Sequence, residues 1–186
     1  MNDLEGGERQ VAVLNDLALP PTVHWSPSGD WFVASASARV DCPADQPVDP
    51  PGFCEELQLL LVNDASGAVE LVATNPGYIA DSPWAPNDDR FVFSTFDPDF
   101  SDGVLDQRFF AATAGEEPVQ LAQTVEGEGR CPWCEGGFGW SPDGLYFGFI
   151  ELGGVISRIE IATGEITVIV DESEDVVVRP RWFGAG

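Results

Sequence analysis

The stretch "GWSPDGLYFGFIELGG" (residues 139–154) contains a Trp-Ser-Pro-Asp-Gly turn. An earlier stretch, "HWSPSGDWFVASA" (24–36), contains nearly the same motif. In both copies, Pro suits the second position of a type I turn and Gly suits the fourth. An apolar segment follows each turn. The repetition predicts one recurring structural unit, and it indicates that the motif serves architecture rather than a reaction.

Two further tryptophan frames belong to the same series. The frame "DSPWAPNDDRFVFST" (81–95) keeps the Pro but loses the Gly, whereas "VRPRWFGAG" (178–186) keeps only the tryptophan. Because the four tryptophans recur with the unit, we expect them to pack between neighbouring units as core spacers. They are Trp25, Trp84, Trp140 and Trp182.

Behind the first three frames, later segments also align. The segments "LQLLLVNDASGAVELVAT" (57–74), "QRFFAATAGEEPVQLAQT" (107–124) and "SRIEIATGEITVIVDE" (157–172) each read as strand, turn, strand. Their glycines stand where a tight hairpin requires positive φ, namely at Gly67, Gly115 and Gly164. Helical periodicity is absent, so each unit is predicted to hold four short strands.

Repeated four-stranded units are typical of β-propeller blades. The Trp-Ser-Pro-x-Gly turn resembles the TolB-like family of propeller repeats, which is related in layout to WD repeats, and the resemblance covers residues 9–183. It implies a fold more than a function, because such blades serve many purposes. The implied fold is an all-β propeller segment, a partial ring with three complete four-stranded antiparallel blades (about 22–74, 81–122 and 137–170) and single end strands (about 9–14 and 177–183).

Three blades are fewer than a propeller usually needs to close its ring. The chain is therefore a fragment of a larger propeller, or it completes a ring with another copy or a partner, or its end strands form a reduced fourth blade. Uncovered blade faces and open edges would otherwise be sites of aggregation.

The charge balance narrows the classes of partner. The chain has 32 acidic and 8 basic residues and a net charge of −24. Such a surface repels nucleic acids and anionic membranes. The negative charge can be explained by solubility, by adaptation to high salt or by the binding of divalent cations. No run of eighteen apolar residues predicts membrane insertion, and no signal peptide is visible in the sequence.

Insertions gather in loops that should share one side of the blades, since antiparallel strands alternate in direction. They are "RVDCPADQPVDPPGFCEE" (39–56), "DPDFSDGVLD" (97–106) and "VEGEGRCPWCEGGF" (125–138). Rigid scaffolds often place function on such loops, so this loop-rich face is a candidate binding surface. The alternative is that these loops merely tolerate insertion.

All four cysteines lie in these loops. Cys42 and Cys54 bracket a Pro-rich loop that a disulfide would staple. Cys131 and Cys134 form "CPWC", which suits a disulfide-closed turn, a redox pair or half of a zinc site. Two disulfides are the favoured interpretation, and they would imply an extracytoplasmic compartment.

Other side chains are candidates for binding. Asp97, Asp99 and Asp102 alternate like calcium ligands, but they fail the EF-hand template, and an acidic loop tip is the competing interpretation. Trp133 interrupts the repeat in an inserted loop and is a candidate partner contact. The lone histidine, His24, has no accompanying nucleophile motif and is expected to be a packed strand residue.

No catalytic motif such as GxSxG or HExxH occurs in the chain. The favoured function is a non-catalytic binding or assembly module that contacts a protein partner, or associates with itself, through the loop-rich face or open blade edges. No cofactor is expected apart from calcium. The alternatives are an accessory propeller of a larger hydrolase, as in prolyl-oligopeptidase-like enzymes, or a calcium- or carbohydrate-binding surface domain.

Overall fold

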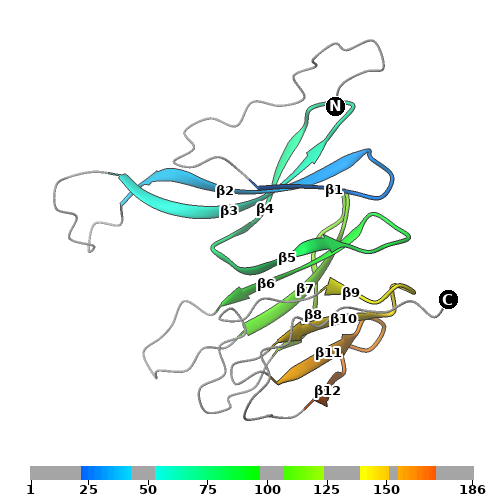
Figure 1. The fold of residues 1–186 in the computed structure, drawn as a ribbon. Helices are drawn as coiled ribbons and strands as arrows, with labels where there is room; N and C mark the ends of the chain where they lie inside the picture. The colour runs from blue at the N-terminus through cyan, green and yellow to red at the C-terminus, as the bar shows by residue number, and fades with distance from the viewer. Residues whose placement is uncertain (1–21, 43–52, 97–106, 124–138, 151–154, 171–186) are drawn as a thin grey trace.

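A computed structural model describes residues 22–42, 53–96, 107–123, 139–150 and 155–170, which form three sheets stacked in chain order (Figure 1). Each sheet has four antiparallel strands, and the described residues contain no helix. The predicted fold class, an all-β partial propeller, is confirmed. The expected end strands, 9–14 and 177–183, lie outside the described residues. Within the described part, no helix long and apolar enough to span a membrane is found.

In each sheet, consecutive strands are neighbours, which is the meander of a propeller blade. Blade 1 consists of β1 (Thr22–Trp25), β2 (Trp31–Asp41), β3 (Phe53–Asn63) and β4 (Val69–Thr74). Blade 2 consists of β5 (Pro76–Trp84), β6 (Arg90–Phe96), β7 (Gln107–Thr113) and β8 (Val119–Gln123). Blade 3 consists of β9 (Gly139–Trp140), β10 (Tyr146–Ile150), β11 (Ile156–Glu160) and β12 (Ile166–Val170).

The Ser-Pro-x-Gly motif closes the first hairpin of blades 1 and 3. In blade 1, Gly29 N donates to Ser26 O at 3.0 Å, and in blade 3, Gly144 N donates to Ser141 O at 2.9 Å. Both glycines have positive φ, 78° and 72°. A residue with a Cβ rarely adopts this conformation, which explains why Gly ends the turn.

The blade 2 turn shows how the motif works without its glycine. Asp88 stands where the other copies have Gly, and it does not adopt positive φ. Its Oδ1 instead accepts a hydrogen bond from Arg90 N at 3.0 Å. The last hairpin of every blade keeps its glycine, and the predicted positive φ is confirmed for Gly67, Gly115 and Gly164 at 69°, 81° and 74°.

Cross-strand partners lie on the same face of a sheet, so the strand register identifies two faces of each blade. We call the face that carries the blade's own motif tryptophan its N-side face, and the opposite face its C-side face. In blade 2, Trp84 pairs with Phe91, and Phe91 pairs with Ala112, so all three belong to the N-side face.

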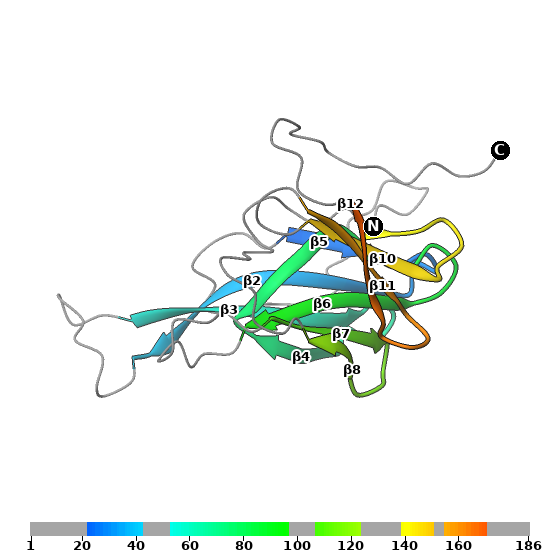
Figure 2. The same ribbon diagram turned by 90° about the horizontal axis from the view of Figure 1, so that it is seen from below.

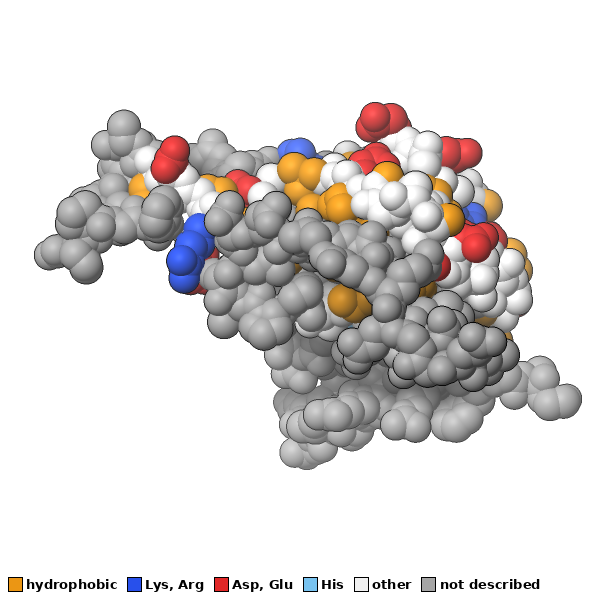
Figure 3. All heavy atoms as spheres, turned by 90° about the horizontal axis from the view of Figure 1, so that it is seen from above, with side chains coloured by type: hydrophobic (Ala, Val, Ile, Leu, Met, Phe, Trp, Pro, Cys, Tyr) orange, Lys and Arg blue, Asp and Glu red, His pale blue; other side chains and the backbone are white. Residues whose placement is uncertain are grey.

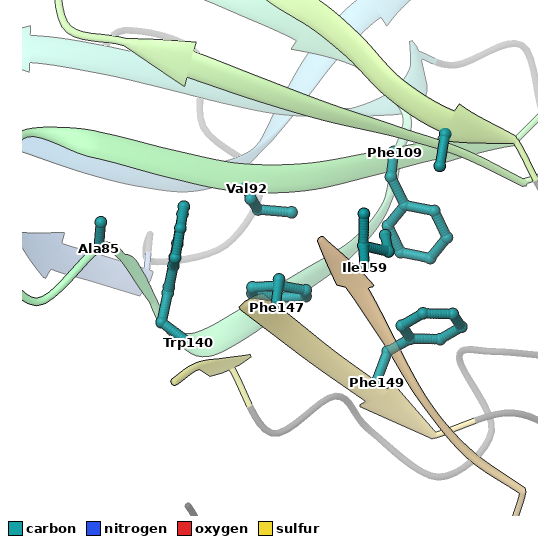
Figure 4. Close-up of a cluster of buried hydrophobic side chains, with 8 residues drawn as sticks. Ala85, Val92, Phe109, Trp140, Phe147, Phe149 and Ile159 are labelled. Atoms are coloured by element: carbon teal, nitrogen blue, oxygen red, sulfur yellow. The ribbon is translucent and has the colours of Figure 1, made fainter. Parts of the chain in front are cut away.

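The core consists of two joints, in which an N-side face packs on the C-side face of the preceding blade. Val33, Leu59 and Leu61 of blade 1 form one cluster with Trp84, Phe91, Phe93 and Ala112 of blade 2. Val92 and Phe109 of blade 2 form the next cluster with Trp140, Phe147, Phe149 and Ile159 of blade 3, whose side chains lie between the two blades (Figure 4). Seen from below, blade 3 lies in front, with the other two blades behind it (Figure 2). The side chains in these two clusters are buried, so the joints hold the three blades together.

Candidate binding surface

The motif tryptophans make one repeated contact across the joints. Trp84 Nε1 donates to the carbonyl of His24 at 2.8 Å, and Trp140 Nε1 donates to the carbonyl of Pro83 at 2.6 Å. In both cases the acceptor is the residue directly before the tryptophan of the preceding blade. The motif therefore supplies a buried apolar ring together with a donor whose acceptor comes from the neighbouring blade.

Trp25 has the same local setting but not the same neighbour. Its ring lies 4.9 Å from that of Phe32, as the ring of Trp84 lies 4.9 Å from that of Phe91. Its exposed fraction is 42%, against 5% for Trp84 and 8% for Trp140, and among the described residues nothing accepts a hydrogen bond from its Nε1. The expectation that Trp25 is a core spacer is wrong in this structure, because no described blade precedes blade 1.

Trp25 belongs to a continuous apolar face. The register places Val23 opposite Ala34, Leu60 opposite Leu71, and Val62 opposite Val69, all on the N-side of blade 1. The side chains at the centre of this face are buried, whereas those on its outermost strands, β1 and β4, are exposed. This N-side face of blade 1 comprises Val23, Trp25, Phe32, Ala34, Ala36, Leu60, Val62, Val69 and Leu71.

Viewed toward this end of the stack, hydrophobic side chains are visible between scattered acidic ones (Figure 3). Exposed fractions are 42% for Val23, 44% for Val69 and 52% for Leu71. Soluble monomers seldom expose contiguous apolar patches without a purpose, and such patches mark interaction sites. The equivalent faces of blades 2 and 3 are covered by another blade.

The opposite end of the stack has a different chemistry. On the C-side face of blade 3, the register places Tyr146 opposite Glu160 and Gly148 opposite Arg158. The Arg158 guanidinium lies over the Tyr146 ring, 4.2 Å from its centroid. Among the described residues, the buried Arg158 Nε has no hydrogen-bond partner. This face therefore presents a cation and an aromatic ring where blade 1 presents hydrocarbon.

A hollow of about 350 Å³ lies between the first turns of blades 1 and 2, lined by Pro27, Ser28 and residues 86–89. Ser28 Oγ donates to Asp89 Oδ2 at 2.6 Å, which joins the two turns. Asp88 pairs with Arg90 at 3.2 Å. No group of three or more side chains that could hold a metal ion occurs within the described ranges.

One carboxylate on this turn side has a perturbed pKa. The Ser141 hydroxyl donates to Asp143 Oδ1 at 2.6 Å, and Leu145 N donates to the same oxygen at 3.0 Å. Both bonds favour the ionised form, so they hold the pKa of Asp143 below its ordinary value of 3.8. The carboxylate belongs to the turn itself, and its role is structural.

Of the two predicted disulfides, the one within the described residues is confirmed. Cys42 and Cys54 are bonded, with Cα atoms 4.9 Å apart, at the end of the β2–β3 hairpin far from the Ser-Pro turn. Asp64 N of the last hairpin donates to Asp30 O at 2.8 Å, which places that hairpin beside the first turn. In blade 1, the long insertion thus emerges on the side opposite the turns, as the alternation of strands predicts.

The remaining predicted site residues lie outside the described residues, so their predicted roles stay predictions. They are Asp97, Asp99, Asp102, Cys131, Trp133 and Cys134, and the fourth motif tryptophan, Trp182, lies outside as well. His24 lies on β1 with a partly exposed side chain, and its carbonyl is the acceptor for Trp84.

Two features of the site were missed by reasoning from sequence. The exposure of Trp25 could have been anticipated from its being the first motif copy, because each tryptophan packs backward onto the preceding blade. The pairing of Tyr146 with Arg158 depends on the strand register, which the sequence leaves open.

Neither a protein-family profile nor a curated protein matches the chain. Among solved structures, it is similar to TolB from Acinetobacter baumannii, with a TM-score of 0.44 and 13% identity over 89% of this chain and 35% of that chain. A 6-phosphogluconolactonase candidate from Bacteroides uniformis gives a TM-score of 0.36 and 12% identity, over 80% of this chain and 54% of that one. The corresponding protein of Bacteroides fragilis gives 0.36 and 14% over the same shares, 80% and 54%. The chain thus spans about a third to about half of the length of these structures.

Proposed function

We propose that the chain is a non-catalytic binding and assembly module of the TolB-like propeller type, and that it contacts a protein partner through the N-side face of blade 1. The observation that carries the proposal is the exposed Trp25. It heads a face whose two counterparts in the same chain are both buried under a neighbouring sheet.

The energetics favour a protein as the partner. Covering an apolar face removes hydrocarbon from water, at about 25 cal/mol per Å² of buried surface. Trp25 also offers an indole N–H, and the joints show that a backbone carbonyl accepts this group. A tryptophan with a ring to bury and a donor to satisfy is a typical anchor residue of protein interfaces.

The disulfide supports an extracytoplasmic setting for this assembly. Disulfides persist in secreted, periplasmic and cell-surface proteins, whereas cytosolic thiols are kept reduced. Cys42 and Cys54 close the long insertion of blade 1 at the end of the sheet opposite the first turn. The stapled hairpin belongs to the same blade as the proposed contact face, so the staple rigidifies the element that binds.

Site-specific photo-crosslinking tests the proposal. A photoreactive phenylalanine analogue replaces Trp25 in one sample and Val119 in the other, and the chain is irradiated after expression in its own compartment. Val119 is 65% exposed on β8, away from the N-side face of blade 1, and it is the matched control. We expect covalent protein adducts from position 25 and none from position 119. Irradiation that yields no adduct from position 25 would refute the proposed function.

A further inference from the structure

We infer that the outer strand of blade 3, β12, binds an extended strand of a basic partner protein along its outer edge. The contact is separate from the one proposed for blade 1 and does not depend on it. β12 is the last strand of its sheet and pairs with β11 on one side (Figure 1). Among the described residues, no strand pairs with its other edge.

The position of this edge is independent of how a ring is completed. In all three sheets, the fourth strand lies at the end opposite the strand that carries the motif tryptophan. Blades meet face to face, so the outer edge of a fourth strand belongs to no joint. Propellers keep such edges short and protected. Whatever stands next to blade 3 therefore leaves the outer edge of β12 unchanged.

β12 exposes three apolar side chains in a row. The exposed fractions are 47% for Val168, 48% for Ile169 and 40% for Val170. On β11, Ser157 is the partner of Val168, and the residue before Ser157 is the partner of Val170. Neighbouring residues of a strand point to opposite faces, so β12 exposes hydrocarbon on both faces of the sheet.

The other two outer strands carry polar side chains that β12 lacks. β4 contains Glu70, and β8 contains Gln120 and Gln123, all of them exposed. The only polar side chain of β12 is that of Thr167. All three strands have a bulge, so the bulge does not distinguish them. Charges on an edge strand discourage pairing with other chains, and their absence from β12 favours the addition of a strand.

The hydrogen bonds of the last hairpin show which main-chain groups the edge offers. Glu160 N donates to Glu165 O at 2.9 Å, so the main chain of Glu165 faces β11. The direction of these groups alternates along an antiparallel strand, which turns the N–H and C=O of Ile166 and Val168 toward the outer edge. In strand addition, such main-chain groups supply the affinity and alternate side chains supply the specificity.

Charge favours a different protein over a second copy as the source of the strand. Glu165 precedes β12, and four of the five residues that follow it in the sequence (171–175) are acidic. Two β12 edges would bring these groups together between copies that each carry −24, and like charges across an interface lower the affinity. Lys or Arg beside the added strand would instead pair with them. The partner segment is therefore extended, apolar and flanked by basic residues.

Photo-crosslinking from the edge tests the inference. A photoreactive phenylalanine analogue replaces Ile169, the chain is irradiated after expression in its own compartment, and the adducts are mapped by mass spectrometry. We expect adducts to a segment of another protein that has Lys or Arg beside an apolar run. Irradiation that yields no adduct, or adducts to a second copy of this chain, would overturn the inference.

Proline at position 168 separates the main chain from the side chain. Val168→Pro removes one outward N–H and no bond to β11, so it should lower the yield of these adducts on the order of tenfold. Val168→Ala is the matched control, because it trims the side chain, keeps the N–H and should retain most of the yield. Equal yields from Val168→Pro and the wild type would show that no strand adds to this edge.

Val168→Lys serves if Val168→Pro fails to fold, as judged from urea midpoints. It keeps the main chain intact and places a positive charge against a basic partner, so it should also suppress the adducts from position 169. Adducts that survive this substitution would contradict the inference. Adducts from position 25 should be the same in all three variants, so a negative result at position 169 leaves the proposed function standing.

Discussion

Blades 1 and 3 share the same five-residue motif, yet the tryptophan is buried in blade 3 and exposed in blade 1. Trp140 is buried, and its indole donates to the carbonyl of Pro83 at 2.6 Å. Trp25 packs on its own Phe32 but is largely exposed on its other side. The turn and the local ring contact come from the motif, whereas burial comes from the blade in front. A repeated sequence therefore specifies a joint only when its other half is present.

The largest expected difference is between the two tryptophans. Trp140→Ala should lower the free energy of unfolding by about 3–5 kcal/mol, because it removes a buried ring and strands a carbonyl. Trp25→Ala should cost about 1 kcal/mol or less, since its ring is already half in water. Urea unfolding followed by tryptophan fluorescence compares the two. Equal losses would mean that Trp25 is covered in the free chain.

A second contrast concerns two hairpin glycines with similar φ. Gly164→Ala should cost about 2–4 kcal/mol, because a Cβ there would collide with the carbonyl oxygen of Leu121 in blade 2, in addition to the strain of positive φ. Gly115→Ala should cost only about 1 kcal/mol, since nothing lies within 4 Å of its Cβ position. Thermal unfolding of both variants measures the difference. A Gly164 variant as stable as the Gly115 variant would show that blades 2 and 3 pack less closely at this turn.

The disulfide offers a third contrast, because it lies away from both joints between blades. Cys42→Ser with Cys54→Ser should lower the free energy of unfolding by about 2–3 kcal/mol, because the closed loop restricts the unfolded chain. The two cysteines lie at the end of blade 1 opposite the turns. The variant should therefore unfold at lower urea and yet give the same crosslinks from position 25 as the wild type. Loss of these crosslinks without loss of stability would place the contact at the stapled insertion.

The smallest expected effect concerns the first turn of blade 3, where Asp143 occupies the position that Ser28 has in blade 1. The pKa of Asp143 is lowered from 3.8, so its stabilisation is present above about pH 4 and is lost as the pH falls through the folded-state pKa. The wild type should be more stable than Asp143→Asn at pH 6, and this difference should disappear as the pH falls below the folded-state pKa of Asp143. Urea midpoints across that range measure it. A difference that does not change with pH would show that the charge of the Asp143 carboxylate does not stabilise the turn.

Most of the blade architecture could be predicted because its determinants are local. Positive φ at Gly67, Gly115 and Gly164 follows from turn chemistry, and the Cys42–Cys54 bond follows from the loop that it closes. The candidate surface could not be predicted in the same way. The Tyr146–Arg158 contact requires a particular strand register, and a shift of one residue would send the two side chains to opposite faces.

The sequence by itself determined the repeating unit, its four strands and the turns between them, since these depend on residues close together in the chain. Only the tertiary structure decided which tryptophan is buried. Trp25, Trp84 and Trp140 have almost the same neighbours in sequence, and they differ in what lies across the joint. Burial is a property of two surfaces, and one repeat describes only one of them.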